Sequence, residues 1–386
     1  MLNMSIKQMD KPIRIAQVVG PVVSGGVETI VMNYYRNIDR SKFQFDFIMD
    51  GYEKTYLDDE IRKLGGRVYK VEPYKKNIIK SMKQYYKIFT ENNYAIVHSH
   101  MNTLSIFPLC SAWLAKVPVR IAHNHSTVCN GEGKRAILKY LLRLFAKVFP
   151  NEYAACSEIT GIWLFGKKNH NLGKVKIIHN AINLEIFKFN EIIRLKLRNE
   201  LELSGKFVIG HVGRFVFAKN HEFLIDIFAE VHKMNRNAIL VLVGSGPLEN
   251  EIMKKIKNLK LESSVKYLGV RHDINRILQV LDVFVFPSTF EGLGIAAIES
   301  QAAGLVTIVS ENIPKEVYID NIRCCRLCEN PGEWAKIILA SDIGNRTIDT
   351  EKFVTNGYCI QRESRNLEVY YQKILKKHLR KNKSNL

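Results

Sequence analysis

Short apolar runs alternate with amphipathic segments along the whole chain, and this alternation constrains the fold more than any other feature. Ile13–Val19 is β-branched and ends at Gly20, and a helical pattern follows from Val27. Strands that alternate with helices indicate βαβ units and a parallel sheet. In the first half of the chain, further strands are expected at Phe43–Met49, Val68–Val71, Ala95–His98, Arg120–His123, Ala154–Ser157 and Val175–His179.

The alternation restarts after residue 184. We therefore predict an α/β protein in which two Rossmann-like, doubly wound parallel sheets face a cleft. Ligands bind at the carboxyl ends of the strands in such sheets. The strands of the second sheet are expected at Phe207–Val212, Ala238–Val243, Val265–Leu268, Val283–Phe286 and Val306–Val309.

Three parts of the chain are expected from these patterns. Residues 1–187 form an N-terminal Rossmann-like domain, and residues 188–360 form a C-terminal one. Residues 361–386 continue a long amphipathic helix that starts near Cys359 and ends in a basic tail. We expect this helix to return to the N-terminal domain.

The chain is strongly basic, with 57 Lys+Arg against 38 Asp+Glu and a net charge of +19. Basic chains attract nucleic acids, phosphorylated small molecules or anionic membranes. Aromatic and basic residues are not interleaved in an RNA-binding pattern, so no nucleic-acid partner is expected. No apolar run reaches the ~18 residues of a spanning helix. Seven cysteines, an odd number, do not make a disulfide framework, so a cytoplasmic protein is expected.

Basic residues recur at helical spacing in the N-terminal half. One such helix is expected to carry an apolar face formed by Leu138, Leu141, Leu142, Leu144 and Phe145. It either lies on an anionic membrane surface or packs its apolar face on the core with the basic face in water. Its basic residues are Lys134, Arg135, Lys139, Arg143 and Lys147.

Two cations follow the first strand of the second sheet. Gly213 allows a tight turn, Arg214 offers a planar fork of donors, and Lys219 adds a point charge five residues later. Two fixed cations at the carboxyl end of a strand suit a diphosphate. Read alone, the same residues also fit a solvated basic loop.

Two glutamates bracket the start of the helix expected at Ile295–Ala303. Gly292 and Gly294 let backbone N–H groups approach an anion at the start of this helix. Glu299 lies eight residues after Glu291 and could accept two hydrogen bonds from a ribose. The same pattern also fits a purely structural explanation, in which Glu291 is favoured at the start of the helix and Glu299 lies on its solvent-exposed face.

Two further glycine pairs follow strands. Gly25 and Gly26 allow close backbone approach to a ligand at the start of the first helix. Gly244 and Gly246 could open a dinucleotide fingerprint, but Glu249 stands at the position of its third glycine. Neither pair is specific by itself.

Histidines end two neighbouring strands, in His98-Ser99-His100 and in His123-Asn124-His125. We expect the two histidines of each pair to point to opposite sides if the strand continues. No carboxylate accompanies them at ligand spacing, so we expect a polar or proton-transfer role, or structural capping, and no metal. The run from Cys324 to Cys328 lacks a second ligand pair.

Taken together and in their order along the chain, the five motifs described above resemble those of the retaining family-4 glycosyltransferases of GT-B fold. The likeness is greatest to bacterial exopolysaccharide and capsule enzymes. The resemblance spans roughly residues 13–375 and is strongest from Phe290 to Gly304. It departs from the family pattern at Ala181, Asn183 and Gly294. It also departs after Leu305, where the family often has a proline.

The resemblance implies a role for each motif residue. Arg214 and Lys219 would hold the donor diphosphate and stabilise the leaving group. Glu291 would contact the transferred sugar, Glu299 the ribose, and His123 the donor sugar near its anomeric centre. His123, Arg214, Lys219 and Glu291 are the expected catalytic residues. The other expected donor-binding residues are Gly25, Gly26, Gly213, Gly244, Gly246, Gly292, Leu293, Gly294 and Glu299.

The activity implied by the resemblance is transfer of a hexose or N-acetylhexosamine from a UDP-sugar to a growing lipid-linked or polymeric glycan. No cofactor and no metal are expected, because fixed cations can stabilise the diphosphate and the sequence contains no Asp-x-Asp triplet. The enzyme would be cytoplasmic and peripheral on an anionic membrane. The alternative is a non-catalytic GT-B binding subunit of a polysaccharide assembly complex.

Overall fold

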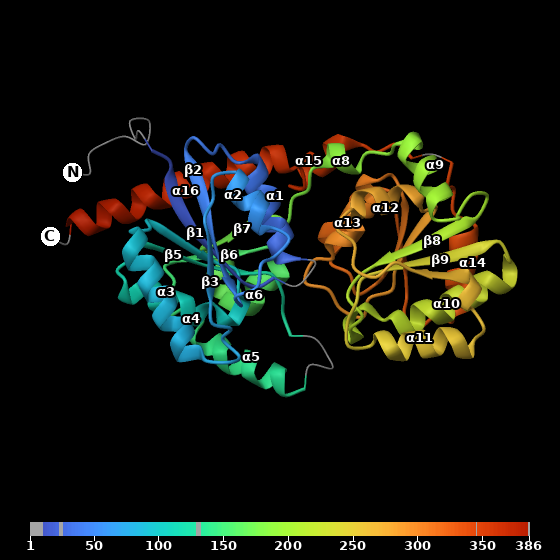
Figure 1. Ribbon diagram of the computed structural model, residues 1–386, viewed down its shortest axis with the longest axis horizontal. Coiled ribbons are helices and arrows are strands. Elements are labelled where there is room, and N and C mark those ends of the chain that lie inside the picture. Colours follow the sequence, from blue (N-terminus) through green and yellow to red (C-terminus); the bar gives the residue numbers. More distant parts are fainter. Residues whose placement is uncertain (1–10, 23–25, 129–132, 345, 385–386) are drawn as a thin grey trace. The chain divides into compact units, whose positions relative to one another are not determined.

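The computed structural model describes residues 11–22, 26–128, 133–344 and 346–384. The chain divides into two compact units (Figure 1). The first comprises the described residues of Met1–Val128, Gly133–Ile182 and Gly357–Leu386, and the second comprises those of Asn183–Asn356. We describe each unit by itself.

The first unit is built on a seven-stranded sheet of order β3-β2-β1-β4-β5-β6-β7. All of its strand pairs are parallel. The central strands β1 and β2 are buried almost continuously, as expected of a parallel sheet covered on both faces. The strands are β1 (Ile13–Pro21), β2 (Phe43–Asp50), β3 (Val68–Val71), β4 (Ile96–Ser99), β5 (Val119–Asn124), β6 (Glu152–Ala155) and β7 (Val175–Ile177).

Helices cover both faces of this sheet (Figure 1). One face buries Ala16 and Val18 in a cluster with Tyr85 and Leu109, which belong to α3 and α4. The helices are α1 (Val27–Asn37), α2 (Asp58–Lys63), α3 (Ile78–Asn92), α4 (Ile106–Leu114), α5 (Lys134–Phe145), α6 (Glu158–Phe165), α7 (Lys167–Asn171) and α16 (Ile360–Ser384), with a 3₁₀ turn η2 at Asn102–Ser105.

The other face is covered in part by the end of the chain. Tyr371 of α16 is fully buried, and its ring lies 5.8 Å from that of Phe43 and 6.2 Å from that of Phe45. Further along α16, Lys377 and His378 both contact the carboxylate of Glu152 at the start of β6. These contacts fix α16 to the first sheet.

The second unit has a six-stranded parallel sheet of order β10-β9-β8-β11-β12-β13. The prediction of an α/β fold with two doubly wound parallel sheets is therefore confirmed. The strands are β8 (Phe207–Val212), β9 (Ala238–Val243), β10 (Val265–Tyr267), β11 (Val283–Phe286), β12 (Val306–Ser310) and β13 (Ile322–Cys325).

The edge strand β13 was not predicted. It contains Cys324 and Cys325 of the cysteine run, and it is short and half exposed, so it lacks the apolar pattern of the inner strands. The helices of this unit are α8 (Leu184–Phe187), α9 (Glu191–Glu200), α10 (His221–Met234), α11 (Glu249–Asn258), α12 (Ile274–Val280), α13 (Ile295–Ala302), α14 (Pro331–Leu339) and α15 (Thr350–Thr355), with 3₁₀ turns η3 (Phe217–Lys219), η4 (Glu262–Ser264) and η5 (Lys315–Val317).

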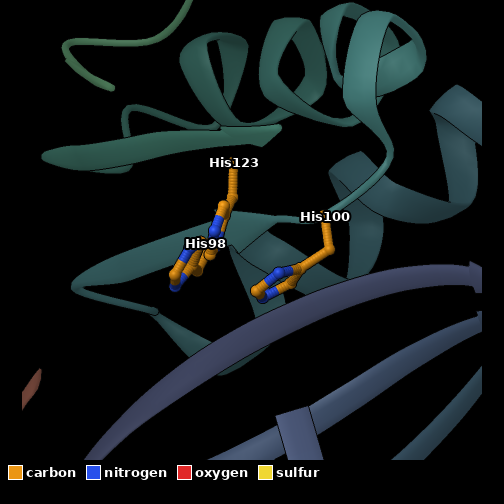
Figure 2. A group of neighbouring side chains, drawn as sticks. All are labelled: His98, His100 and His123. Carbon is orange, nitrogen blue, oxygen red and sulfur yellow. Dashed lines mark hydrogen bonds between the residues drawn. The ribbon is translucent and has the colours of Figure 1, made fainter. Parts of the chain in front are cut away.

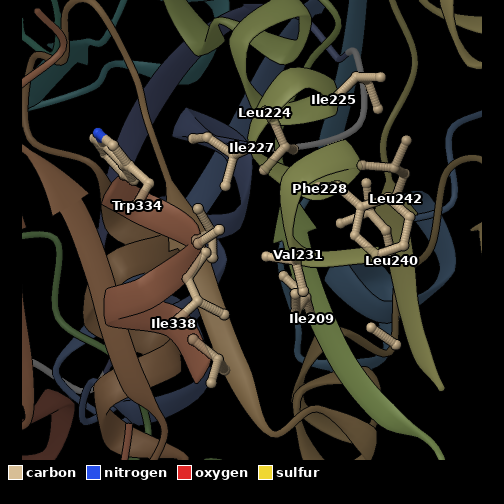
Figure 3. Packing of buried hydrophobic residues seen from close by; sticks show 14 of the residues in the cluster. Ile209, Leu224, Ile225, Ile227, Phe228, Val231, Leu240, Leu242, Trp334 and Ile338 are labelled. Atoms are coloured by element: carbon tan, nitrogen blue, oxygen red, sulfur yellow. The ribbon is translucent and has the colours of Figure 1, made fainter. Parts of the chain in front are cut away.

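The core of the second unit lies between its sheet and the helices α10 and α14 (Figure 3). Phe228 and Val231 of α10 pack with Leu240 and Leu242 of β9. Trp334 of α14 is fully buried, and its indole N–H donates to the carbonyl of Arg326 at 3.1 Å. This core holds β8 and β9 rigidly under the loops that follow them.

Both sheets reverse their strand order in the same way, between β1 and β4 in the first and between β8 and β11 in the second. Ligands of open α/β sheets bind at such reversals, outside the carboxyl ends of the strands. The predicted site residues follow these strands or their neighbours. Within the described residues, no helix combines the length and apolar character needed to cross a bilayer.

Candidate active site

The loop after β8 is held by close backbone packing against the loop after β9. Gly213 donates its N–H to the carbonyl of Val243 at 3.0 Å. A Cβ at Gly244, where φ is +130°, would lie 2.0 Å from the carbonyl oxygen of Gly213, and one at Gly246 would lie 2.5 Å from that of Phe215. These two glycines are therefore required by loop packing, a reason that the sequence pattern did not reveal.

Lys219 and Glu291 form an ion pair between the loops that follow β8 and β11. The Nζ of Lys219 lies 2.6 Å from Oε1 of Glu291, and both side chains are largely buried. The same Nζ lies 4.4 Å from the ring centre of Phe286, at the end of β11. Backbone contacts tie these loops together, because Thr289 donates its N–H to the carbonyl of Ala218 at 2.8 Å.

Arg214 differs from Lys219 in having no partner within the described part of the chain. Its side chain is exposed. Among the residues that the structure describes, none forms a hydrogen bond or an ion pair with its guanidinium. An unpaired guanidinium beside an anchored lysine leaves net positive charge at the carboxyl end of β8, which suits a phosphate group.

The turn before α13 explains one departure from the family pattern. Gly294 is the N-terminal cap of α13 with a φ of +93°, and its carbonyl accepts the N–H of Ala297 at 3.0 Å. A φ of this sign favours glycine. Glu291 and Gly294 both belong to the loop between β11 and α13, so they lie beyond the carboxyl end of β11.

Glu299 lies one turn further along α13 and is half-buried. Burial raises the pKa of its carboxyl from 4.5 to about 8, because the charged form loses hydration that no cation replaces. In the described part of the chain, no side chain is hydrogen-bonded to it. Glu299 is therefore a partly protonated acid near neutral pH, able to gain from hydroxyl donors of a ligand.

Four histidines of the first unit gather where β4 and β5 end. Figure 2 shows His98, His100 and His123 pointing toward one another. The ring centres of His98 and His100 are 4.2 Å apart, and those of His123 and His125 are 4.0 Å apart. The expectation that the two histidines of each pair point to opposite sides is wrong, because residues two positions apart along a strand lie on the same face.

Hydrogen bonds connect these rings to one another and to α16. His98 lies 3.1 Å from His123, between Nε2 and Nδ1, and 2.8 Å from the hydroxyl of Tyr371. His100 lies 3.0 Å from His125 and 2.8 Å from Oε1 of Gln17. Burial lowers the pKa of His98 and of His125 to about 3, so the rings are neutral at physiological pH.

The histidine cluster could offer nitrogen ligands to a metal ion. The ligand atoms of His98, His100 and His123 lie within 4.8 Å of one another. Both nitrogens of His98 and both of His100 already have protein partners. A metal would have to displace these hydrogen bonds, so the geometry fits a hydrogen-bonded network better than a metal centre.

The glycine motif of the first unit is only partly described. Gly26 precedes α1 with a φ of +126°, and among the described residues a Cβ built on it would meet no atom within 4 Å. The described surroundings therefore leave room beside this glycine, as a ligand-facing loop requires. Gly25, the other glycine predicted to bind the donor, lies outside the described residues.

Comparisons with known proteins agree over both units. Residues 24–186 match the family model "Glycosyltransferase Family 4", and residues 194–341 match "Glycosyl transferases group 1". The chain is similar to the putative glycosyltransferase EpsF of Bacillus subtilis, with 33% identity over 342 residues that cover 86% of this chain and 88% of the relative.

Two further proteins are similar over most of their length. One is the UDP-Gal:α-D-GlcNAc-diphosphoundecaprenol α-1,3-galactosyltransferase of Escherichia coli, with 28% identity that covers 79% of this chain and 81% of the relative. The other is the crystal structure of Anabaena HepE in complex with UDP-glucose, with a TM-score of 0.71 at 19% identity, covering 96% of this chain and 99% of that chain. This likeness of structure establishes a shared GT-B fold.

Proposed function

This chain belongs to the family-4 glycosyltransferases, and from that premise we propose that it moves a hexose or N-acetylhexosamine from a UDP-sugar to a glycan acceptor in cell-surface polysaccharide synthesis. The observation that carries the proposal is the Lys219–Glu291 pair, which joins the loop that contains Arg214 to the loop that leads into α13, the helix of Glu299. The Escherichia coli relative's name gives a UDP-sugar donor and a diphospho-undecaprenol acceptor, which supports this choice of substrates.

The two cations account for departure of the nucleoside diphosphate. As the bond between the anomeric carbon and the phosphate oxygen breaks, negative charge grows on the leaving UDP. Arg214 and Lys219 stabilise that charge, and the diphosphate competes with Glu291 for Lys219. Glu291 is then free to accept a hydrogen bond from the transferred sugar. Fixed cations in this position make a bound metal unnecessary.

Retention of configuration follows if acceptor and leaving group react on one face of the sugar. Retaining glycosidases place two carboxyl groups only about 5–5.5 Å apart to form a covalent intermediate. Here Glu291 is instead assigned to a hydroxyl of the transferred sugar and Glu299 to the ribose, so neither carboxylate is assigned as a nucleophile. We therefore propose that the acceptor oxygen attacks on the face that the phosphate leaves, while the phosphate oxygen takes the acceptor's proton.

The family resemblance also assigns donor-binding roles to backbone amides and to His123. The amides of Gly292, Leu293 and Gly294 would bind the sugar and phosphate, and Gly26 would let its loop approach the reacting groups. His123 would donate a hydrogen bond to the donor sugar. We place the enzyme in the cytoplasm, at a membrane that carries the lipid-linked acceptor.

A thermal-shift screen of nucleotide-sugars tests this proposal. A UDP-sugar present at a hundredfold excess over its dissociation constant should stabilise the native chain by about 2.7 kcal/mol. UDP should stabilise it too, and GDP should not. The variant Arg214→Gln should lose most of the shift while unfolding at the same temperature without ligand. If no nucleotide shifts the wild type, the chain is a non-catalytic GT-B subunit and the proposal is wrong.

A further inference from the structure

Helix α5 lies at the lower edge of the first unit in Figure 1. It exposes most of its apolar side chains to solvent instead of burying them. None of its residues is buried. Leu141 is 55% exposed and Leu144 is 71% exposed. A contiguous apolar surface of this size on a single helix is unusual for a soluble protein and indicates an interaction site. Its large side chains are Ile137, Leu138, Tyr140, Leu141, Leu144 and Phe145, continued by Val148 beyond the helix end.

The polar side of α5 faces the protein. Lys139 donates through Nζ to the carbonyl of Thr127 at 3.1 Å. The guanidinium of Arg143 lies over the ring of Trp163 in α6, 5.4 Å from its centre. The alternative in which the apolar face packs on the core is wrong for this helix, because that face is exposed at every predicted position except Leu142, which is partly covered.

The apolar surface is bordered by positive charge. Lys134, Arg135 and Lys147 are exposed at the two ends of α5. No aspartate or glutamate occurs between Gly133 and Asn151. An apolar helix face flanked by cations complements an anionic lipid surface, in which acyl chains lie beneath negative headgroups.

We propose that α5 docks this enzyme on an anionic membrane by inserting its apolar face into the interface. Lys134, Arg135 and Lys147 then lie at the level of the lipid phosphates. The proposal rests on the proposed function only in that a lipid-linked acceptor gives the enzyme a reason to be there. Docking through α5 would hold the first unit at the depth where such an acceptor emerges.

Co-sedimentation with vesicles tests the proposal on the full chain. We compare vesicles of phosphatidylcholine with vesicles that contain about one-third phosphatidylglycerol, at low and high salt. The test variant is Leu141→Glu with Leu144→Glu. The matched control is Ile192→Glu with Leu195→Glu in α9. These two apolar side chains have the same spacing as the α5 pair, and they are 78% and 61% exposed.

The wild type and the α9 control should bind the anionic vesicles equally. The α5 variant should bind about 100-fold more weakly, which is what burial of two leucine side chains contributes. Replacing Lys134, Arg135 and Lys147 by glutamine should remove the preference for anionic lipid, at roughly fivefold per cation. All variants should keep the UDP-induced thermal shift, which separates failure of docking from failure of the proposed function.

Three results would overturn the proposal. The first is a wild type that does not sediment with anionic vesicles at low salt. The second is equal weakening of binding in the two double variants. The third is a wild-type dimer in sedimentation velocity that Leu141→Glu with Leu144→Glu converts to a monomer without loss of vesicle binding. A second copy of the chain, and not lipid, would then cover α5.

A second inference follows from the hydrogen bonds of Gln17, which is buried in β1. Its amide nitrogen can only donate, and it lies 3.2 Å from the hydroxyl of Tyr371. Its amide oxygen can only accept, and it lies 2.8 Å from Nε2 of His100. Gln17 therefore fixes the direction of the hydrogen bonds on both of its sides.

The proton positions follow one by one. Because the Tyr371 hydroxyl accepts from Gln17, its own proton goes to Nδ1 of His98 at 2.8 Å. A neutral His98 then carries its proton on Nε2 and donates it to Nδ1 of His123 at 3.1 Å. The proton of neutral His123 must therefore be on Nε2. That nitrogen is buried and, among the described residues, has no hydrogen-bond partner.

We infer that Tyr371 is a positioning residue, which fixes His123 as a donor through Nε2–H toward an oxygen of the ligand. A buried donor without a partner costs free energy, so the site gains when a sugar hydroxyl or ring oxygen accepts this proton. The inference rests on the proposed function for the identity of that oxygen, but the tautomer itself does not depend on it. It also gives α16 a role in the site of the first unit.

Nitrogen-15 NMR of histidine-labelled protein tests the inference without substrate. The wild type should show His98 and His123 protonated on Nε2. Tyr371→Phe keeps the ring packing on Phe43 and Phe45 but should convert both histidines to tautomer mixtures and lower kcat about tenfold. Tyr370→Phe is the matched control, since the neighbouring Tyr370 hydroxyl is buried without a partner among the described residues.

Unchanged tautomers in Tyr371→Phe, or an Nδ1 proton on His123 in the wild type, would refute this role for Tyr371. Equal losses of kcat in the Tyr371 and Tyr370 variants would also refute it, because both exchanges remove one buried hydroxyl from the same turn of α16. The UDP-induced thermal shift of Tyr371→Phe reports separately on whether the donor site is correctly assigned.

Discussion

Replacing Glu299 by glutamine should stabilise the protein while weakening donor binding. Burial raises the pKa of this carboxyl to about 8, against 4.5 for the ordinary group. An acid whose pKa is higher in the folded chain opposes folding wherever the unfolded chain would ionise it. This penalty is absent below pH 4.5, grows between pH 4.5 and 8, and is constant above.

The size of the effect follows from the two pKa values. Each pH unit between 4.5 and the working pH contributes about 1.36 kcal/mol. The penalty is therefore at most about 3.4 kcal/mol at pH 7, and at most about 4.8 kcal/mol above pH 8. Glutamine has nearly the same shape and cannot ionise, so Glu299→Gln removes the penalty.

Denaturant unfolding at pH 5, 6, 7 and 8 measures the free energy of unfolding of each protein. The gap between Glu299→Gln and wild type should be small at pH 5 and widen steadily to pH 8. Glu251→Gln in α11, at an exposed position, is the control for loss of a surface charge. A gap that does not depend on pH would refute the reasoning, as would a variant less stable than wild type at pH 8.

The same exchange should change the proton balance of UDP binding. Ribose hydroxyls donate to the carboxylate and favour its charged form, so wild-type binding at pH 7 should release protons. Calorimetry in buffers of different ionisation enthalpy measures this release. Glu299→Gln should release none at this site and should bind UDP more weakly.

Two other variants test the site in the second unit. Lys219→Met should lower kcat by about 10²–10³, because it removes a cation from the developing diphosphate charge and leaves Glu291 unpaired, and steady-state kinetics should show it. Gly244→Ala should lower the melting temperature strongly, because its Cβ would lie 2.0 Å from a carbonyl oxygen. Gly205→Ala is the control, with a φ of +70° but open space around its Cβ. Equal melting temperatures for the two alanine variants would contradict the packing explanation.

Periodicity predicted the sheets because burial on both faces makes parallel strands read as apolar runs. Phe207–Val212, Ala238–Val243 and Val283–Phe286 were predicted with the bounds that β8, β9 and β11 have. The glycines and charged residues that directly follow these strands were also visible, since the carboxyl ends of parallel strands meet at one edge. The edge strand β13 was missed because it lacks that apolar run.

Contacts between distant parts of the chain could not be predicted from the sequence. The pair formed by Lys219 and Glu291 joins residues 72 positions apart, and the contact of Tyr371 with His98 joins residues 273 apart. Both depend on the order of strands and the path of α16. The sequence also did not determine which side of α5 packs on the protein. An amphipathic pattern shows that a helix has an apolar and a polar face, but it does not show which face contacts the protein.

The most direct test of the account is transfer or hydrolysis of a UDP-sugar in the presence of EDTA, with wild type, Arg214→Ala and Glu299→Ala compared at equal donor concentration. We expect the wild type to keep its rate in EDTA, Arg214→Ala to lose at least about 100-fold in kcat, and Glu299→Ala to show mainly a higher KM for the donor. Wild-type rates in both variants would contradict the assigned site, and loss of wild-type activity in EDTA would contradict catalysis by fixed cations alone.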